Sequence, residues 1–129
     1  MKKLDITIIK NAQRETARLE LDRTTSTLSI TFADGMQKTY SDTDIYTCFG
    51  LKIRKFCEIT FLRKGSKINV YPSAMVSQMS SGVVAYEVTM GDPDAELVRI
   101  FDYEENNLTN DINEQIAYRL KWSDSLQRS

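Results

Sequence analysis

Basic side chains cluster between residues 52 and 67. They form the first group in the sequence whose residue types and spacing suit a binding site. Six cations lie there against the single acid Glu58, with phenylalanines beside and among them. Cations neutralise phosphates and aromatic rings stack on bases, so the segment is compatible with a nucleic-acid-binding face. The six basic residues are Lys52, Arg54, Lys55, Arg63, Lys64 and Lys67.

The same segment has a plainer interpretation. Strand side chains alternate between two faces, which puts Phe61 on the same face as Cys57 and Ile59 and predicts that its ring enters the core. The cations then lie on the outer face, in water or against a partner. We favour this interpretation and treat the six cations as a predicted partner-binding face.

Acidic side chains dominate the next part of the chain, from Glu87 to Glu114, where Arg99 is the only cation. The stretch 92–94 reads Asp-Pro-Asp, which lacks the ligand order of an EF-hand calcium loop. A proline between two carboxylates is typical of a turn, so we predict no metal site there. The predicted acidic partner-binding face consists of Asp92, Asp94, Glu96, Glu104 and Glu105.

A chain of net charge −1 is thus divided into a positive and a negative segment. If the two segments pair in one sheet, their charges neutralise each other for a small gain in stability. If they lie on separate faces, each face can steer a complementary partner protein. The sequence leaves both alternatives open.

The sequence contains few residues or motifs that suit catalysis or cofactor binding. The chain has no histidine, which removes the commonest general base and every Ser-His or Cys-His nucleophile. Cys48 and Cys57 have neither the number nor the spacing for a zinc site or a disulfide framework. No glycine-rich phosphate loop is present, so we expect no cofactor. A carboxylate-dependent enzyme drawing on Glu87, Asp102 and Glu104 remains a third-ranked alternative.

Methionines occur in a polar stretch, YPSAMVSQMSSG, that follows the basic segment. Methionine is flexible and polarisable, so Met75 and Met79 are candidates for a partner-binding loop if they are exposed. The alternative, which we favour, is that they fold under the loop and seal the core.

Alternating apolar residues predict about eight strands, most of them paired in hairpins. Asp34-Gly35 suits a two-residue type I′ turn, and Lys64-Gly65 suggests a second hairpin turn. Residues 83–88 and 97–103 carry apolar side chains on both faces, which predicts a central strand pair covered on both sides. The expected strands cover residues 4–9, 17–23, 27–32, 36–40, 57–61, 68–70, 83–88 and 97–103.

Two segments read as helices. One begins near residue 42 and reaches the early fifties, with Ser41 and Asp44 arranged like a capping box, although a strand is the alternative there. The other is the C-terminal helix, whose predicted buried stripe is Ile112, Ile116 and Leu120. We expect residues 123–129 to fray.

These elements predict one α+β domain over residues 1–129, mainly antiparallel β, with a curled sheet or roll and a C-terminal amphipathic helix. The element order resembles a pleckstrin-homology-like barrel, although no motif assigns the chain to a family. No secretory signal or membrane span is visible, and we expect a cytoplasmic protein with no membrane partner.

The expected function is a small non-enzymatic module that binds another protein, as an inhibitor, immunity factor, regulator or assembly adaptor. Nucleic-acid binding through residues 52–67 is the second-ranked alternative. An exposed strand edge would also allow a homodimer.

Overall fold

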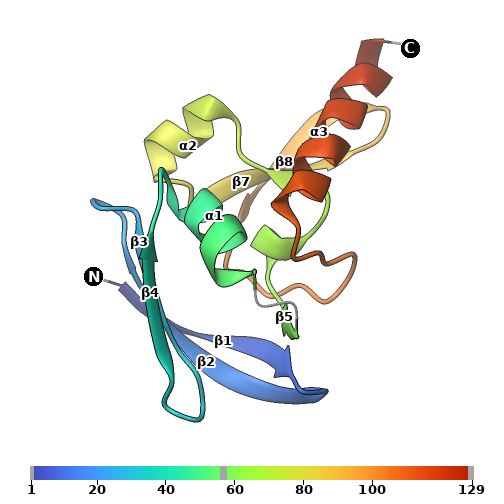
Figure 1. The fold of residues 1–129 in the computed structure, drawn as a ribbon. Coiled ribbons are helices and arrows are strands. Elements are labelled where there is room, and N and C mark those ends of the chain that lie inside the picture. Colours follow the sequence, from blue (N-terminus) through green and yellow to red (C-terminus); the bar gives the residue numbers. More distant parts are fainter. Residues whose placement is uncertain (1, 56–57, 128–129) are drawn as a thin grey trace.

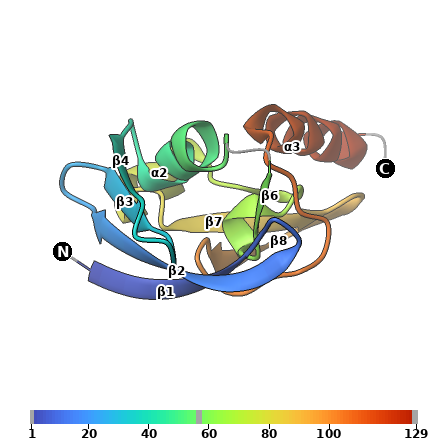
Figure 2. The same ribbon diagram turned by 60° about the horizontal axis from the view of Figure 1, so that its bottom comes forward.

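The computed structural model describes residues 2–55 and 58–127 of the chain. Within those ranges the chain forms eight strands in two antiparallel sheets, together with three α-helices (Figure 1). The first sheet curls along one side of the molecule, and α3 lies on the opposite side with the second sheet between them (Figure 2). The predicted α+β class, with antiparallel strands and a C-terminal helix, is confirmed.

The first sheet has the strand order β4-β3-β2-β1-β5. Alternate residues of its strands point into the core, where side chains such as Ile8, Leu19 and Ile30 are fully buried. This is the outcome that the alternating pattern predicts, because successive strand residues face opposite sides. The strands are β1 (Lys2–Lys10), β2 (Gln13–Asp22), β3 (Thr27–Thr31), β4 (Gln37–Ser41) and β5 (Ile59–Phe61).

The hairpin predicted around Asp34-Gly35 is present, but its turn type is not the predicted one. Only Gly35 has a positive φ, +88°, and its N–H donates to the carbonyl of Phe32 at 2.9 Å. That geometry is a type I turn followed by a left-handed residue. The two-residue turn with both φ angles positive occurs instead at Asn11-Ala12, with φ of +54° and +63°, between β1 and β2.

The second sheet has the order β6-β7-β8, with β6 at Val70–Tyr71, β7 at Val84–Thr89 and β8 at Asp92–Arg99. The hairpin predicted from residue 57 to residue 70 is wrong, because β5 pairs with β1 and β6 pairs with β7. Lys64–Ser66 form a 3-10 turn, η2, in place of the hairpin turn. Gly65 is needed there for close packing, since a Cβ atom would lie 2.9 Å from the side chain of Ile100.

The helix expected after residue 42 is confirmed against the strand alternative. It comprises α1 (Ile45–Cys48) and a π-helical continuation, η1 (Phe49–Ile53). Its N-cap is Asp44, whose carboxylate accepts from the backbone N–H of Thr47 at 2.6 Å, and not Ser41, which ends β4. The polar methionine stretch forms a second short helix, α2 (Ala74–Ser80).

The C-terminal helix α3 runs from Ile112 to Gln127 and thus includes most of the stretch expected to fray. Its predicted buried stripe is wrong. Ile112 is buried, but Leu120 is 63% exposed, and the other fully buried side chain of α3 is Gln115. Polar Gln115 belongs to the inner face because it meets backbone carbonyls there, which an apolar pattern cannot reveal.

Phe49 and Phe61 pack edge to face in the core with their ring centroids 5.5 Å apart. The plainer interpretation of the basic segment is therefore correct for these two rings. Cys57, which alternation assigns to the same face, and Phe56 lie outside the described residues. Cys48 is buried as a free thiol, and burial raises its pKa to about 11.

The turn at Asn11-Ala12 yields a stability prediction. A left-handed backbone is costly for alanine and nearly free for glycine, and Ala12 is exposed, so no packing is lost when its methyl group is removed. We expect Ala12→Gly to raise the free energy of unfolding by about 0.5–1 kcal/mol in denaturant titrations. The control Ala117→Gly, at an exposed position inside α3, should lower it by about 1 kcal/mol. Destabilisation by Ala12→Gly would contradict the left-handed assignment.

Candidate functional site

Two lysines of the predicted basic face and two glutamates of the acidic segment meet in one ion-pair cluster. Lys64 Nζ lies 2.7 Å from Glu87 Oε1 and 3.0 Å from Glu104 Oε1. Lys67 Nζ lies 3.0 Å from an oxygen of each glutamate. None of the four side chains is more than 24% exposed. Two charges of the basic segment and two of the acidic segment therefore neutralise each other in this cluster.

Mutual charge compensation keeps all four groups ionised near neutral pH. Burial alone would raise the pKa of Glu104, but hydrogen bonds from Lys67, Lys64 and two backbone N–H groups outweigh it and lower that pKa to about 2. Glu87 shifts the same way for the same reason. Burial would lower the pKa of both lysines, yet the bonds to the glutamates leave them raised. These directions are typical of a structural network.

Two arginines of the predicted basic face point inward. Arg54 is completely buried and donates to the carbonyl of Thr109 at 2.6 Å and to Gln115 Oε1 at 2.5 Å. Burial lowers its pKa to about 10. Arg63 is only 7% exposed and lies over the ring of Tyr103. Neither guanidinium is available to a partner, so the predicted basic face is not a continuous surface.

The other predicted charged residues are scattered. Lys55 is exposed and lies over the ring of Tyr40, and Lys52 is partly exposed on η1. Glu105 is exposed and lies 3.8 Å from Arg14. Only three carboxylates of the predicted acidic face remain together, along the first half of β8, and these are Asp92, Asp94 and Glu96. Across the described ranges, no three Asp, Glu, Cys or His side chains are placed to hold a metal ion.

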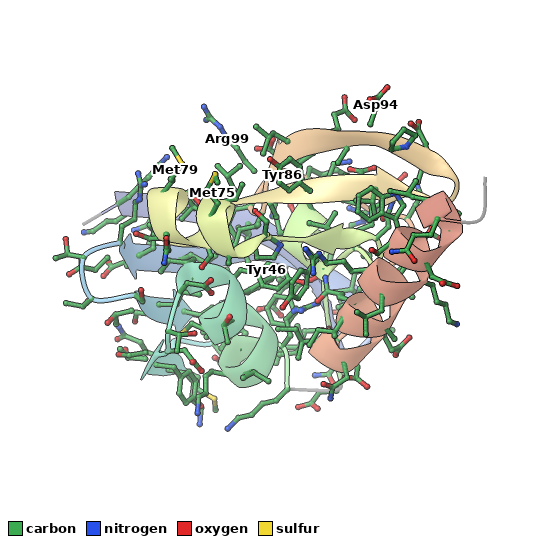
Figure 3. All side chains as sticks on the ribbon, turned by 90° about the horizontal axis from the view of Figure 1, so that it is seen from above. Tyr46, Met75, Met79, Tyr86, Asp94 and Arg99 are labelled. Atoms are coloured by element: carbon green, nitrogen blue, oxygen red, sulfur yellow. The ribbon has the colours of Figure 1, made fainter. Side chains whose placement is uncertain are left out.

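The methionines of the polar stretch lie on the surface. Met75 and Met79 are 69% and 77% exposed, so the expectation that they seal the core is wrong. They line a groove of about 640 Å³ between α2, β7, β8 and the ends of β1 and β2. Figure 3 shows them on the same side of the molecule as Tyr86 and Arg99. We call this hollow the α2 groove.

Hydrogen bonds at the start and in the middle of α2 hold it beside the groove. Ser73 caps α2 by accepting from the N–H of Val76 at 3.2 Å. Ser77 donates to the carboxylate of Asp44, the residue that also caps α1, so the two helices are joined. Gly82 follows α2 with φ of +83°, and a Cβ atom there would lie 2.8 Å from the backbone N of Tyr46. The exposed methionines therefore stand on an anchored element.

Cations rim the α2 groove. Lys2, Arg23 and Arg99 line it, and Asp102 is the one carboxylate that does so. None of the three cations makes an ion pair in the part of the chain that the structure describes. Leu97 adds an apolar side chain that is 58% exposed. The groove thus combines flexible apolar side chains with unpaired positive charge.

Sequence reasoning missed Leu97 and the three cations of the groove. The apolar pattern places Leu97 in a central strand pair covered on both sides, whereas β8 is an edge strand. The sequence signal for this surface is the presence of apolar residues on both faces of β7 and β8. One of those faces is uncovered at Leu97, which leaves that side chain exposed. Nothing local in the sequence brings Lys2 and Arg23 to the same place as Arg99.

No protein-family model matches the chain, and a search of curated proteins gives no significant match. In the described ranges, no helix has the length and apolar character needed to cross a lipid bilayer.

The ion-pair cluster predicts a pH-dependent stability. The pKa of Glu104 is about 2 in the folded protein and 4.5 ordinarily, so its contribution is present above pH 4.5 and is lost as the pH falls towards 2. We expect Glu104→Gln to lower the free energy of unfolding at pH 7 by about 1–3 kcal/mol. It should also flatten the fall in stability between those two pH values. Both effects are measurable by denaturant titration.

Glu105→Gln is the matched control, because this neighbouring carboxylate is exposed, lies 3.8 Å from Arg14 and accepts a bond from the Tyr103 hydroxyl that a glutamine oxygen can also accept. We expect a change within about 0.5 kcal/mol. Equal effects of the two substitutions would mean that the cluster contributes no more than a surface ion pair.

Proposed function

We propose that this protein is a non-enzymatic module that binds another protein through the α2 groove. The observation that carries the proposal is the exposure of Met75 and Met79, at 69% and 77%, over a hollow of about 640 Å³. Exposed apolar side chains of this kind lose contact with water when a partner covers them. Methionine adapts its shape to the side chains that it meets. Of the surfaces predicted from sequence, the methionine segment is thus the one with a suitable shape.

Electrostatics supports a non-enzymatic role. A general acid or base works best with a pKa near the working pH. Glu87 and Glu104, two of the three carboxylates considered for catalysis, have pKa values shifted downward by the lysines beside them. Asp102, the third, lines the α2 groove. The network thus holds its carboxylates in the ionised form and gives them no tendency to exchange protons at neutral pH.

The basic segment gives less support to nucleic-acid binding than to protein binding. Arg54 and Arg63 are turned inward, and Lys64 and Lys67 are neutralised by glutamates. Phe61 is buried, so its ring has no exposed face on which a base could stack. A cytoplasmic location belongs to the proposal, as does a partner that is not yet identified.

Site-specific photo-crosslinking tests the proposal. A photoreactive residue at position 79 would report on the α2 groove, and one at position 36 would report on a distant hairpin where the native Met36 is 52% exposed. Both proteins would be irradiated in a lysate of the source cells. We expect a protein adduct from position 79 that position 36 does not give. An adduct of twice the chain mass would identify a second copy as the partner.

The captured partner then allows an affinity test. Met75→Ser combined with Met79→Ser removes apolar contact area while leaving stability within about 0.5 kcal/mol, because both side chains are exposed. We expect the purified partner to bind at least about tenfold more weakly to this variant in calorimetry. Met36→Ser is the control and should bind like the original protein. Equal labelling from both positions, or unchanged affinity of the double variant, would refute the proposal.

A further inference from the structure

A second hollow, of about 410 Å³, lies between α3 and the strands of the second sheet. Three aromatic residues line it: Tyr71 from β6, Tyr86 from β7 and Trp122 from α3. We call it the α3 cleft. Its volume lies in the range of small-molecule sites, and aromatic walls are typical of such sites. It adjoins the α2 groove at Tyr86, which lines both hollows.

Hydrogen bonds hold the walls of the α3 cleft in place. Trp122 Nε1 donates to the carbonyl of Asp92 at 2.8 Å. Ser125 Oγ accepts from the backbone N–H of Gly91 at 2.9 Å. Both bonds fasten the end of α3 to the tip of the β7–β8 hairpin. The cleft is therefore already formed in the free protein, and a ligand need not order α3.

Asn69 is a fixed part of the cleft wall. Its side-chain nitrogen donates to the carbonyl of Val88 at 2.8 Å, which fixes the orientation of the amide. Asn69 Oδ1 has almost no exposed surface and has no hydrogen-bond partner within the described ranges. A ligand in the cleft therefore contacts other groups of the wall and does not bond to this oxygen.

One cation in the lining also lacks a counter-ion. The guanidinium of Arg119 lies 5.3 Å from the ring centroid of Tyr71, and no carboxylate of the described chain is within ion-pair distance of it. The other charged lining residue is Asp94, whose side chain points away from the body of the molecule (Figure 3). Gln115 also lines the cleft, but its amide is already bonded to backbone carbonyls and to Arg54.

From these groups we propose that the α3 cleft binds a free small molecule, a planar aromatic carboxylate. The ring stacks between the aromatic walls. The carboxylate pairs with Arg119, whose planar guanidinium suits a carboxylate. The site is independent of the protein-binding role of the α2 groove.

Indole-3-acetate is a suitable probe because it has the planar ring and the carboxylate. Indole-3-acetamide has the same ring but lacks the charge. Trp122 is the single tryptophan of the chain, so its indole N–H gives a unique resonance in ¹⁵N-labelled protein. We expect indole-3-acetate to shift that resonance in a saturable way. The acetamide should bind about tenfold more weakly.

Two variants assign the charge contact to its residue. Arg119 is exposed, so Arg119→Gln should fold normally, and it should bind the acetate and the acetamide with equal affinity. Lys121→Gln removes an exposed cation two positions away that does not line the cleft, and it should keep the full preference for the acetate.

Three outcomes would overturn the inference. The first is an unshifted Trp122 resonance at millimolar probe, and the second is equal binding of acetate and acetamide by the original protein. The third concerns the source of the carboxylate, since a peptide that ends in tryptophan carries the same groups. Binding of Gly-Gly-Trp about tenfold more tightly than indole-3-acetate would mean that the cleft recognises a peptide terminus rather than a free small molecule.

Discussion

The structure depends on the buried amide of Gln115. Its nitrogen lies within hydrogen-bond distance of the carbonyls of Gly65, Lys67 and Val70, at 2.9, 2.8 and 3.3 Å. Its oxygen accepts from Arg54, which is itself buried. One side chain of α3 therefore satisfies the irregular backbone that separates the two sheets and also the cation that follows η1. Backbone carbonyls without such partners would be costly in the interior, so α3 is an integral part of the fold.

The ion-pair cluster of Lys64, Lys67, Glu87 and Glu104 joins the same irregular stretch to the second sheet. Its lysines come from η2 and the residue that follows it, and its glutamates come from β7 and from the loop after β8. Four of the opposite charges in the two segments thus neutralise each other inside the molecule. What remains for recognition is the exposed apolar surface of the α2 groove with its unpaired cations, together with the aromatic walls of the α3 cleft.

The sequence predicted those parts of the fold in which neighbouring residues decide the structure. Alternation located β1 to β4, and the spacing of apolar residues located the helix that begins at Ile45. The sequence patterns gave wrong predictions where contacts between distant residues decide the structure. The segment around Gly65 looked like a hairpin turn, but the close approach of Ile100 and the carbonyl-binding Gln115 make it part of an interior connection. The inner face of α3 was predicted wrongly for the same reason. The buried side chain there is the amide of Gln115, whereas Leu120 is exposed.

The candidate site was partly predictable. Methionines in a polar stretch made α2 a contact candidate, and both side chains are exposed in the structure. The apolar content of both faces of β8 predicted a strand covered on both sides, whereas Leu97 on one face is exposed. The cations of the α2 groove come from three separate strand ends or connections, and no local pattern can bring them together. The predicted basic face failed because the sequence shows charge but not direction, and Arg54 turns inward.

The long separation in sequence between Gln115 and the groups that it satisfies has a consequence for biosynthesis. The β1–β4 meander contains contacts between neighbours in the sequence, which form quickly, and it leaves the ribosome first. The carbonyls of Gly65, Lys67 and Val70 emerge long before their partner does, and Arg54 precedes its acceptor by 61 positions. The nascent chain thus passes through an interval in which half of it is folded while the other half lacks the residue that completes it. A chain truncated shortly before residue 115 would never acquire Gln115, and its second half would stay incomplete.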